Sequence, residues 1–426
     1  MNSVPKSLRL QIGIFGRTNA GKSSFLNMVA GQDVAIISEL PGTTTDVVEK
    51  CMELLPVGPV VLLDTAGFGD ESKLGGLRTE KAKKIFDRAD IGVVVLESNV
   101  WTRVEEEIFW QLKMRNTPVL AVINKIDKAL PTAHFVETVK EAAGKFMLCS
   151  STDKEDRDEY VDELKKHILK LTPDKYFDDA RLLGDLLKPR SLAVLIVPID
   201  IEAPKGRIIL PQVQAVRDCL DSSAGCLVLK ESEYAYFLAN MKIKPDIVVC
   251  DSQVVDRMVK ETPGDIACTT FSILLARLKG GLGGSIKSVF EVQNLADQDR
   301  VLIAESCSHH PLEDDIGRVK IPKWLEEYTK KNLRFESCAG RDYLENLSEF
   351  KMIIHCGSCM ITRKEMYFRM EKAAVSGVPL VNYGVMISYL KGTLERVISP
   401  FRDELNLYYI ESAKHRESGV NKAARK

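Results

Sequence analysis

The chain has 426 residues, 45% of them hydrophobic and 28% charged, a composition typical of globular proteins that excludes a disordered or fibrous chain. At roughly 100–200 residues per domain, this length predicts several domains. The 59 basic and 60 acidic residues leave a net charge of −1, so we expect neither nucleic acid nor a membrane surface as a partner. The N-terminus lacks a secretory signal and no apolar run is long enough to span a membrane, which predicts a cytoplasmic protein.

Residues 1–172 are predicted to form the first domain. Between residues 8 and 170, apolar runs that suit strands alternate with helical patterns, which is typical of βαβ units in a mainly parallel sheet with helices on both faces. The expected strands are residues 12–15, 60–63, 91–96, 119–123 and 146–148.

A phosphate-binding motif, Gly16-Arg17-Thr18-Asn19-Ala20-Gly21-Lys22-Ser23, follows the first of these strands and opens a helix, which is the context that a P-loop requires. Its glycines let backbone N–H groups surround the phosphates, Lys22 adds positive charge at the β- and γ-phosphates, and the Ser23 hydroxyl ligates Mg²⁺. The alternative is a glycine-rich turn without a ligand, which the spacing and context disfavour. The predicted nucleotide-binding residues here are Gly16, Asn19, Ala20, Gly21, Lys22, Ser23 and Ser24.

Two later motifs each end an apolar strand and complete a nucleotide site. In Asp64-Thr65-Ala66-Gly67, the carboxylate can hold the magnesium shell and the Gly67 amide can meet the γ-phosphate. In Asn124-Lys125-Ile126-Asp127, the Asp127 carboxylate can accept from two guanine donors that adenine does not present together, which favours GTP over ATP. Ser150 and Ser151 are predicted to cover the guanine base through their backbone groups.

The segment Pro41-Gly42-Thr43-Thr44-Thr45-Asp46 is predicted to be a switch loop. A threonine here can ligate Mg²⁺ only while the γ-phosphate is present. We favour Thr44 as the magnesium ligand beside Ser23, and sequence alone does not separate it from Thr45. Lys22, Asp64 and Gly67 are the predicted catalytic residues of GTP hydrolysis.

These residues together resemble the translation-factor-related GTPases of the TrmE, Era and EngA type. Phe68 stands where Ras-like enzymes use a glutamine to orient the attacking water. Related GTPases with an apolar residue there often carry an asparagine at the position of Asn19, which helps to hold potassium beside the phosphates, so the resemblance implies potassium-stimulated hydrolysis. The alternative for Asn19 is a hydrogen bond that stiffens its own loop.

Two smaller α/β domains are predicted to follow, at residues 190–279 and 285–415. Strand-like runs recur in both, and the boundary between them is placed at the five-residue run Gly280-Gly281-Leu282-Gly283-Gly284, whose glycines suit a hinge. The middle domain shows no catalytic motif. The fold class is therefore α/β, with a P-loop domain on a parallel-type sheet and two smaller α/β domains behind it.

Cysteine and histidine cluster in two loops of the third domain. Glu305-Ser306-Cys307-Ser308-His309-His310 and His355-Cys356-Gly357-Ser358-Cys359 each follow an apolar strand, so both are expected at the carboxyl edge of one sheet. A Cys-x-His and His-Cys-x-x-Cys array can surround a metal centre, and its spacing suits a structural zinc as well as an iron–sulfur cluster. The alternative is buried thiols and ordinary histidines.

The succession of a GTPase domain, a middle α/β domain and a third domain with the Cys-x-His and His-Cys-x-x-Cys motifs resembles the HydF family of FeFe-hydrogenase maturation GTPases. The resemblance implies that Cys307, Cys356 and Cys359 bind a 4Fe–4S cluster, and that the chain is a scaffold or carrier that assembles or delivers the di-iron subcluster to FeFe-hydrogenase. It also implies partnership with that hydrogenase and its radical-enzyme maturases, and dimerisation through the middle domain. Three thiolates leave one iron open, and His309, His355 and Glu305 are the candidate protein ligands for it.

The main alternative is a ribosome- or tRNA-associated GTPase whose third domain holds a structural zinc. Such a protein is expected to show a basic surface with interleaved aromatic residues, and neither the charge nor any motif supplies one.

Overall fold

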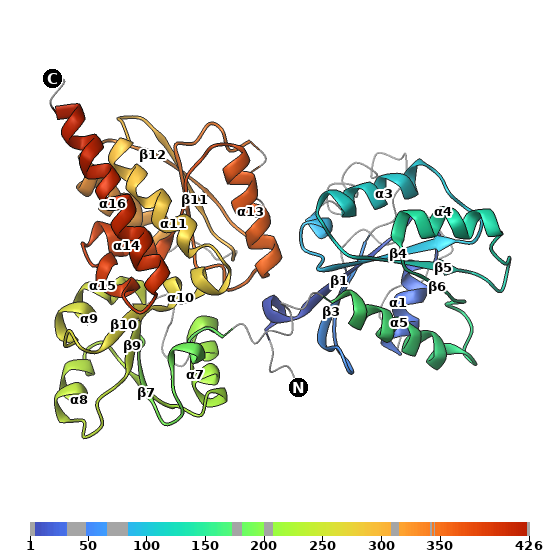
Figure 1. The fold of residues 1–426 in the computed structure, drawn as a ribbon, viewed down its shortest axis with the longest axis horizontal. Coiled ribbons are helices and arrows are strands. Elements are labelled where there is room, and N and C mark those ends of the chain that lie inside the picture. Colours follow the sequence, from blue (N-terminus) through green and yellow to red (C-terminus); the bar gives the residue numbers. More distant parts are fainter. Residues whose placement is uncertain are drawn as a thin grey trace. The chain divides into compact units, whose positions relative to one another are not determined.

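The structure is a computed structural model that describes residues 5–31, 48–65, 84–172, 181–199, 208–307, 315–340, 343–344 and 346–423. The chain divides into two compact units, residues 1–179 and 180–426. Figure 1 shows a sheet with flanking helices in each unit. The units are described separately below.

Unit 1 is built on one six-stranded sheet in the order β2-β3-β1-β4-β5-β6. All neighbouring strands run parallel except β2, which pairs antiparallel with β3 at the edge. The strands are β1 (Leu10–Phe15), β2 (Val48–Leu54), β3 (Gly58–Asp64), β4 (Ile91–Glu97), β5 (Val119–Asn124) and β6 (Phe146–Leu148). The helices are η1 (Lys6–Leu8), α1 (Lys22–Ala30), α3 (Arg103–Met114), α4 (Ala133–Ala143) and α5 (Arg157–Leu171).

Alternation along the strands divides the core of unit 1 between the two faces of the sheet. Ile12 and Ile14 of β1 pack in one apolar cluster with α1 and α5, whereas Phe15 belongs to a second cluster with α3 and α4. Successive side chains of a strand point to opposite faces, so a fully apolar strand must be covered twice. The helices therefore lie on both faces, as the sequence pattern predicts (Figure 1).

Unit 2 contains two four-stranded sheets, and all strand pairs in both are parallel. Their orders are β10-β9-β7-β8 and β12-β11-β13-β14, so in each sheet the first strand lies between the second and the third. The strands are β7 (Leu192–Ile196), β8 (Gly225–Leu229), β9 (Ile247–Cys250), β10 (Ala267–Thr270), β11 (Arg300–Ala304), β12 (Arg334–Cys338), β13 (Met352–His355) and β14 (Leu380–Asn382).

Helical segments connect and cover these two sheets. Those around the first sheet are η2 (Gly184–Leu186), α7 (Leu210–Asp221), α8 (Tyr234–Asn240), η3 (Ser252–Val254), α9 (Val255–Glu261) and α10 (Phe271–Leu278). Those around the second are α11 (Leu282–Val289), η4 (Phe290–Asn294), η5 (Ile316–Lys320), α12 (Ile321–Thr329), α13 (Arg363–Val375), α14 (Tyr383–Leu390) and α16 (Arg402–Ala423). The helix α15 (Leu394–Ile398) comes late in the chain but packs against β10 of the first sheet.

The two sheets of unit 2 share one apolar core. A single cluster of buried residues runs from Leu182 to Phe401 and includes strands of both sheets. The helices α10 and α14 each start directly after the last strand of their sheet, and their first turns meet, because the Ser272 hydroxyl donates to Asn382 Oδ1 at 3.0 Å. Gly283 and Gly284 lie inside α11 rather than in a flexible hinge.

The predicted strands all occur, within a few residues of the expected bounds. The division into domains 1–172, 190–279 and 285–415 remains a prediction. No helix among the described residues has the length and apolar character needed to cross a membrane.

Candidate functional site

The P-loop joins β1 to α1, and two glycines shape it. Gly16 has a φ of +146° and a Cβ there would collide with the backbone carbonyl of Val95 on β4. Gly21 has a φ of +97° and a Cβ there would collide with the Asn124 amide. A side chain at either position would be strained and would push the loop from the neighbouring strand ends. The loop can therefore lie close against the sheet edge, with the first turn of α1 behind it.

Lys22 is buried in the first turn of α1, with only 7% of its surface exposed. Its Nζ donates to the backbone carbonyl of Arg17 at 2.8 Å, inside the loop. Burial lowers the pKa of Lys22 to about 8, and the nearby Asp64 carboxylate partly opposes that shift. The loop thus holds a desolvated ammonium group that gains a counter-charge when phosphate binds.

Asp64 ends β3, and its carboxylate lies 3.3 Å from the Ser23 hydroxyl, which donates to Oδ2. Burial raises the pKa of Asp64 to about 6, against the attraction of Lys22. The other oxygen, Oδ1, is buried and has no hydrogen-bond partner among the described residues. A hydroxyl and a carboxylate with an unused oxygen are the hard ligands that Mg²⁺ takes beside nucleotide phosphates, so these residues fit the predicted cation.

Asn124 ties the P-loop to the loop after β6. Its Nδ2 donates to the Ala20 carbonyl at 3.0 Å, and its Oδ1 accepts from the Ser151 amide at 3.0 Å and the Ser151 hydroxyl at 2.9 Å. The three loops that the sequence assigns to phosphate and base therefore meet at one side chain. Because both ends of the amide are used within the protein, Asn124 acts here as a link between loops.

Asp127 and Lys125 extend from the same strand end. The Ser150 hydroxyl donates to Asp127 Oδ1 at 2.7 Å, which fixes the carboxylate predicted to meet guanine. Lys125 has a left-handed φ of +63° and its Nζ forms an ion pair with Glu97 at 2.9 Å. Glu97 lies on β4, outside every sequence motif, so the sequence alone does not indicate this ion pair.

Several predicted residues lie outside the described part of the chain. These are Thr44 and Thr45 of the predicted switch loop, together with Gly67 and Phe68. Asn19 is described: it is exposed, has a left-handed φ of +66°, and its side chain makes no hydrogen bond to another described residue. The alternative in which Asn19 stiffens its own loop through such a bond therefore has no support among the described residues.

The cysteine loops lie at the carboxyl ends of β11 and β13, which are adjacent parallel strands paired through Ala304 and His355. In this sheet β12 lies on one side of β11, and β13 and β14 lie on the other, so the strand order reverses between β11 and β13. Ligands of open α/β sheets gather in the crevice at such a reversal. The topology thus brings Cys307 and the Cys356–Cys359 loop to one place.

Direct contacts join these two loops. The Ser306 amide donates to Cys356 Sγ at 3.1 Å, and the Cys356 amide donates to the Ala304 carbonyl at 2.9 Å. Cys307 and Cys356 are partly exposed, as is Cys359, and burial raises the pKa of the Cys359 thiol to about 11. A backbone amide aimed at sulfur stabilises a thiolate, which is the form that binds a metal.

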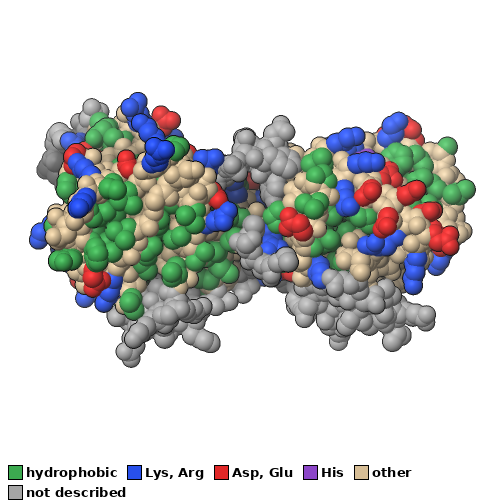
Figure 2. All heavy atoms as spheres, turned by 90° about the horizontal axis from the view of Figure 1, so that it is seen from below, with side chains coloured by type: hydrophobic (Ala, Val, Ile, Leu, Met, Phe, Trp, Pro, Cys, Tyr) green, Lys and Arg blue, Asp and Glu red, His purple; other side chains and the backbone are tan. Residues whose placement is uncertain are grey.

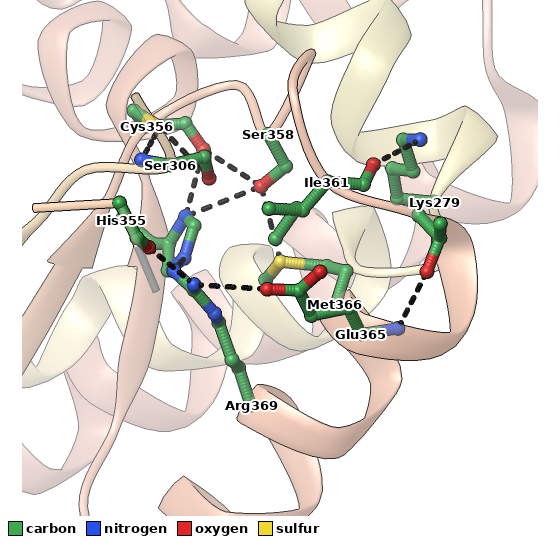
Figure 3. A network of polar contacts seen from close by, with 11 residues as sticks. Lys279, Ser306, His355, Cys356, Ser358, Ile361, Glu365, Met366 and Arg369 are labelled. Atoms are coloured by element: carbon green, nitrogen blue, oxygen red, sulfur yellow. Dashed lines mark hydrogen bonds and ion pairs between the residues drawn. The ribbon is translucent and has the colours of Figure 1, made fainter. Parts of the chain in front are cut away.

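His355 is fully buried beneath the loop. Its Nδ1 lies 3.0 Å from the Cys356 carbonyl and 3.2 Å from the Ser358 hydroxyl, and its Nε2 lies 3.1 Å from Arg369 Nη1 (Figure 3). Burial and the Arg369 charge lower the pKa of His355 to about 3, so the ring is neutral. Both ring nitrogens have partners within the protein.

Of the other candidate ligands, Glu305 is buried and forms an ion pair with Arg318 on η5, with 3.2 Å between Oε2 and Nη2. His309 lies outside the described residues. Within the described ranges, the structure brings together no group of three or more His, Cys, Asp and Glu side chains placed to hold a metal ion. The described geometry thus joins the loops without showing a complete ligand set.

Sequence reasoning missed the residues that support the cysteine loop. Arg369 and Glu365 on α13 form a buried pair with 3.3 Å between Nη2 and Oε1. Directly after α10, the buried Lys279 donates to the Ile361 carbonyl at 2.8 Å, and within α10 Leu275 Cδ1 lies 3.2 Å from where a Cβ on Gly357 would be. The sequence gives only a weak sign of the pair, because Glu365 and Arg369 stand at i and i+4 of α13, a spacing of opposite charges that is usually found on exposed helices.

Comparison with protein families finds three matches in chain order. Residues 11–125 match the model described as 50S ribosome-binding GTPase, residues 182–280 the hydrogen maturase F dimerization domain, and residues 283–400 the hydrogen maturase F tetramerization domain. Unit 1, which contains residues 11–125, is thus a P-loop GTPase domain, which hydrolyses GTP, and two further α/β regions follow it. The predicted fold class and GTPase assignment are confirmed.

Several curated tRNA modification GTPases match part of the chain. The tRNA modification GTPase MnmE of a Synechococcus species is 41% identical over 124 residues, which are 29% of this chain and 26% of that protein. MnmE of Caldicellulosiruptor saccharolyticus is 33% identical over 157 residues, 37% of this chain and 33% of that protein. The chain thus spans about a quarter to a third of the length of these relatives. A crystal structure of Aquifex aeolicus Era aligns with 24% identity and a TM-score of 0.35, covering 52% of this chain and 92% of that one.

Proposed function

The chain joins a GTPase domain to the dimerization and tetramerization domains of the hydrogen maturase F family, and on this basis we propose that it is a hydrogenase-maturation GTPase that holds a 4Fe–4S cluster on Cys307, Cys356 and Cys359. In this function the protein assembles or carries the di-iron subcluster and delivers it to FeFe-hydrogenase, with the hydrogenase and its radical-enzyme maturases as partners.

One observation carries the cluster assignment: the loops after β11 and β13 touch at the strand-order reversal, where the Ser306 amide meets Cys356 Sγ at 3.1 Å. The donor set suits iron and sulfide because thiolates are the usual ligands of such clusters. Gly357 adds a second fit, because its Cα faces Leu275 and Ser272 of α10 with little room for a side chain, so the backbone turns tightly between two cysteines. Both the thiol chemistry of these residues and their position in the fold support the proposed 4Fe–4S cluster.

Only three cysteines are assigned, so one iron of the cluster is left without a protein thiolate. That iron can take an exchangeable ligand, and a fourth cysteine would block it. An exchangeable position is what a scaffold needs in order to accept and release a cargo, and we assign the cluster this binding role.

The GTPase domain supplies the nucleotide-dependent step. Lys22 would place its charge at the phosphates of bound GTP, and Ser23 and Asp64 would hold Mg²⁺, whose charge would offset the negative charge that develops when water attacks. We propose that Asn19, which is exposed on the P-loop and whose side chain makes no hydrogen bond to another described residue, helps to hold potassium there. GTP turnover then regulates release from the partner protein. Partner dissociation rates measured with GTP, with GDP and without nucleotide test this step, and identical rates contradict it.

Self-association is supported by the two family matches of unit 2, which are a dimerization and a tetramerization domain. We propose that the first contact is made by β8, one of the two edge strands of the sheet β10-β9-β7-β8. Exposed apolar side chains occur on β8 and on the helices α7 and α8 beside it, at Val213, Leu220, Val228, Tyr236 and Phe237. An unpaired strand edge with apolar neighbours is a natural surface for a second copy.

The deciding experiment is anaerobic purification of the full chain, reconstitution with ferrous iron and sulfide, metal analysis and electron paramagnetic resonance of the reduced protein. We expect about four irons and four sulfides per chain, lost in Cys307→Ser, Cys356→Ser or Cys359→Ser. Cys51→Ser, a partly exposed cysteine on β2 of the GTPase domain, is the matched control and should keep the cluster. A protein that takes up one zinc and no iron contradicts the proposal and favours the structural-zinc alternative.

A further inference from the structure

The hydrogen bonds of His355 define which ring nitrogen carries the proton. The Cys356 carbonyl can only accept, so Nδ1 bears the hydrogen; Arg369 can only donate, so Nε2 accepts from Nη1 at 3.1 Å. The ring is therefore a neutral bridge between the cysteine loop and α13. Neither nitrogen is left with a free lone pair for another ligand.

Arg369 is itself anchored on several sides. Its guanidinium, with 2% of the residue exposed, forms an ion pair with Glu365, donates to the Gly340 carbonyl at 2.7 Å and lies 4.9 Å above the Tyr343 ring. A buried guanidinium that lost one of these partners would keep a desolvated charge, which strongly opposes rearrangement. The position of His355 is thus determined by a framework that lies outside the cysteine motif.

The same framework fixes the turn between the two cysteines. Ser358 adopts a left-handed φ of +62°, which a residue with a side chain adopts only when its surroundings impose it. Its buried hydroxyl lies 3.2 Å from His355 Nδ1, 3.2 Å from the Cys356 carbonyl and 3.1 Å from the Met366 sulfur (Figure 3). His355 therefore sits under the turn that spaces Cys356 from Cys359.

We propose that His355 is a positioning residue of the cysteine loop, held by the Arg369–Glu365 pair, and that it is not the fourth cluster ligand. The inference rests on the proposed function for its cluster part. To reach an iron, Nε2 would have to leave Arg369, or Nδ1 would have to leave the loop carbonyl that it supports. The fourth position then belongs to a group other than His355.

The first test uses the full chain labelled with ¹⁵N-histidine, reconstituted with ferrous iron and sulfide, reduced, and measured by pulsed electron paramagnetic resonance. We expect no nitrogen coupling to the cluster of the kind that a bound imidazole gives, or a coupling that persists in His355→Asn because it comes from another histidine. The asparagine amide of this variant keeps a hydrogen-bond donor near the Nδ1 position. A coupling that is present in the wild type and lost in His355→Asn at equal iron content overturns the proposal.

A second test needs no metal. In the metal-free chain, Arg369→Gln should raise the rate at which iodoacetamide alkylates Cys356 and Cys359 by about tenfold, because hydrogen bonds to a charged group hold the loop closed. Arg363→Gln, on the exposed start of the same helix, is the matched control and should leave the rate unchanged. An unchanged rate in Arg369→Gln contradicts the positioning role. If the wild type binds no iron at all, the proposed function fails while this test still decides the role of the framework.

Discussion

At the scale of single residues, the nucleotide site is a pair of opposed buried charges. The pKa of Lys22 is lowered to about 8 and that of Asp64 is raised to about 6, and burial is the main cause of both shifts. Each group is therefore poised to change protonation state within two pH units of neutrality, which free lysine and aspartate are not. The affinity of a ligand that requires both the Lys22 ammonium and the Asp64 carboxylate should therefore depend on pH.

We therefore expect the affinity for Mg²⁺–GTP to be highest between about pH 6 and pH 8. Below pH 6 the Asp64 carboxylate must lose a proton before it can hold the cation, and above pH 8 Lys22 must gain one before it can hold phosphate, so affinity should fall by up to about tenfold per pH unit on each side. Titration with a fluorescent GTP analogue at constant ionic strength measures this profile.

Binding of GDP in the presence of a magnesium chelator provides the control. The acidic limb should weaken because Asp64 then has no cation to hold, while the alkaline limb should remain because Lys22 still meets the phosphates. An affinity that does not change between pH 5 and pH 9 contradicts the assignment of both groups.

Asn124 yields a second prediction at this scale. Asn124→Ala leaves the Ala20 carbonyl and the Ser151 amide without their partner, so we expect a loss of about 1–3 kcal/mol in the free energy of unfolding of the GTPase domain. Nucleotide affinity should fall as well, because the P-loop and the base loop are no longer joined. Urea unfolding and nucleotide titration measure the two effects, with Thr138→Ala, at a partly exposed position of α4, as the control.

Motif spacing predicts the residues of the candidate site but not the residues that hold them in place. The P-loop and the Cys-x-x-Cys turn are contiguous, so the sequence shows their residues together. By contrast, Arg369 reaches His355 from the helix after the loop, and Lys279 reaches the Ile361 carbonyl from another part of the fold. Such contacts depend on how helices pack, and a single sequence carries no sign of them.

At the scale of elements, buried strands were predictable and the polar edge strand was not. The central strands are covered on both faces, so they stand out as continuous apolar runs such as residues 91–96. The strand β2 contains Glu49, Lys50 and Glu53, because it lies at the sheet edge, and its sequence gives no apolar signal. The strand order that the two small sheets share was not predictable from the sequence either, because the order depends on where each crossover connection places the next strand.

The helix α10 should affect the cysteine loop although it belongs to the middle sheet. Leu275→Ala removes the side chain beneath Gly357, and we expect unit 2 to lose about 2–5 kcal/mol of stability and the loop to hold less iron. Urea unfolding and iron content after reconstitution measure these changes. Leu183→Ala, at the core beside α7, should destabilise similarly while keeping its iron. Equal iron loss in both variants contradicts a specific role for α10.

At the scale of the whole molecule, apolar side chains gather on one face of unit 2. Figure 2 shows hydrophobic groups over a broad area there, and the exposed residues of the middle part include Val228 on the edge strand β8, 41% exposed, and Tyr236 on α8, 68% exposed. A monomer with such a surface is expected to associate.

Val228→Lys should therefore weaken self-association by at least about tenfold, because a charge on an edge strand opposes pairing with a second strand. Sedimentation velocity over a range of concentrations measures the effect. Val375→Lys at the end of α13, where the wild-type valine is 85% exposed, is the matched control and should leave the association constant unchanged. Equal weakening in both variants would point to net charge rather than to β8.

The single apolar core of unit 2 constrains how this protein can be taken apart. Because buried residues from Leu182 to Phe401 form one cluster, cutting the chain at the glycine run would strip each fragment of part of its interior. Scanning calorimetry of the nucleotide-free chain should accordingly resolve two melting events, one for each compact unit, with both small sheets lost in the same event. In cells, a truncation between the two sheets should then yield aggregates or degradation products in place of two working modules.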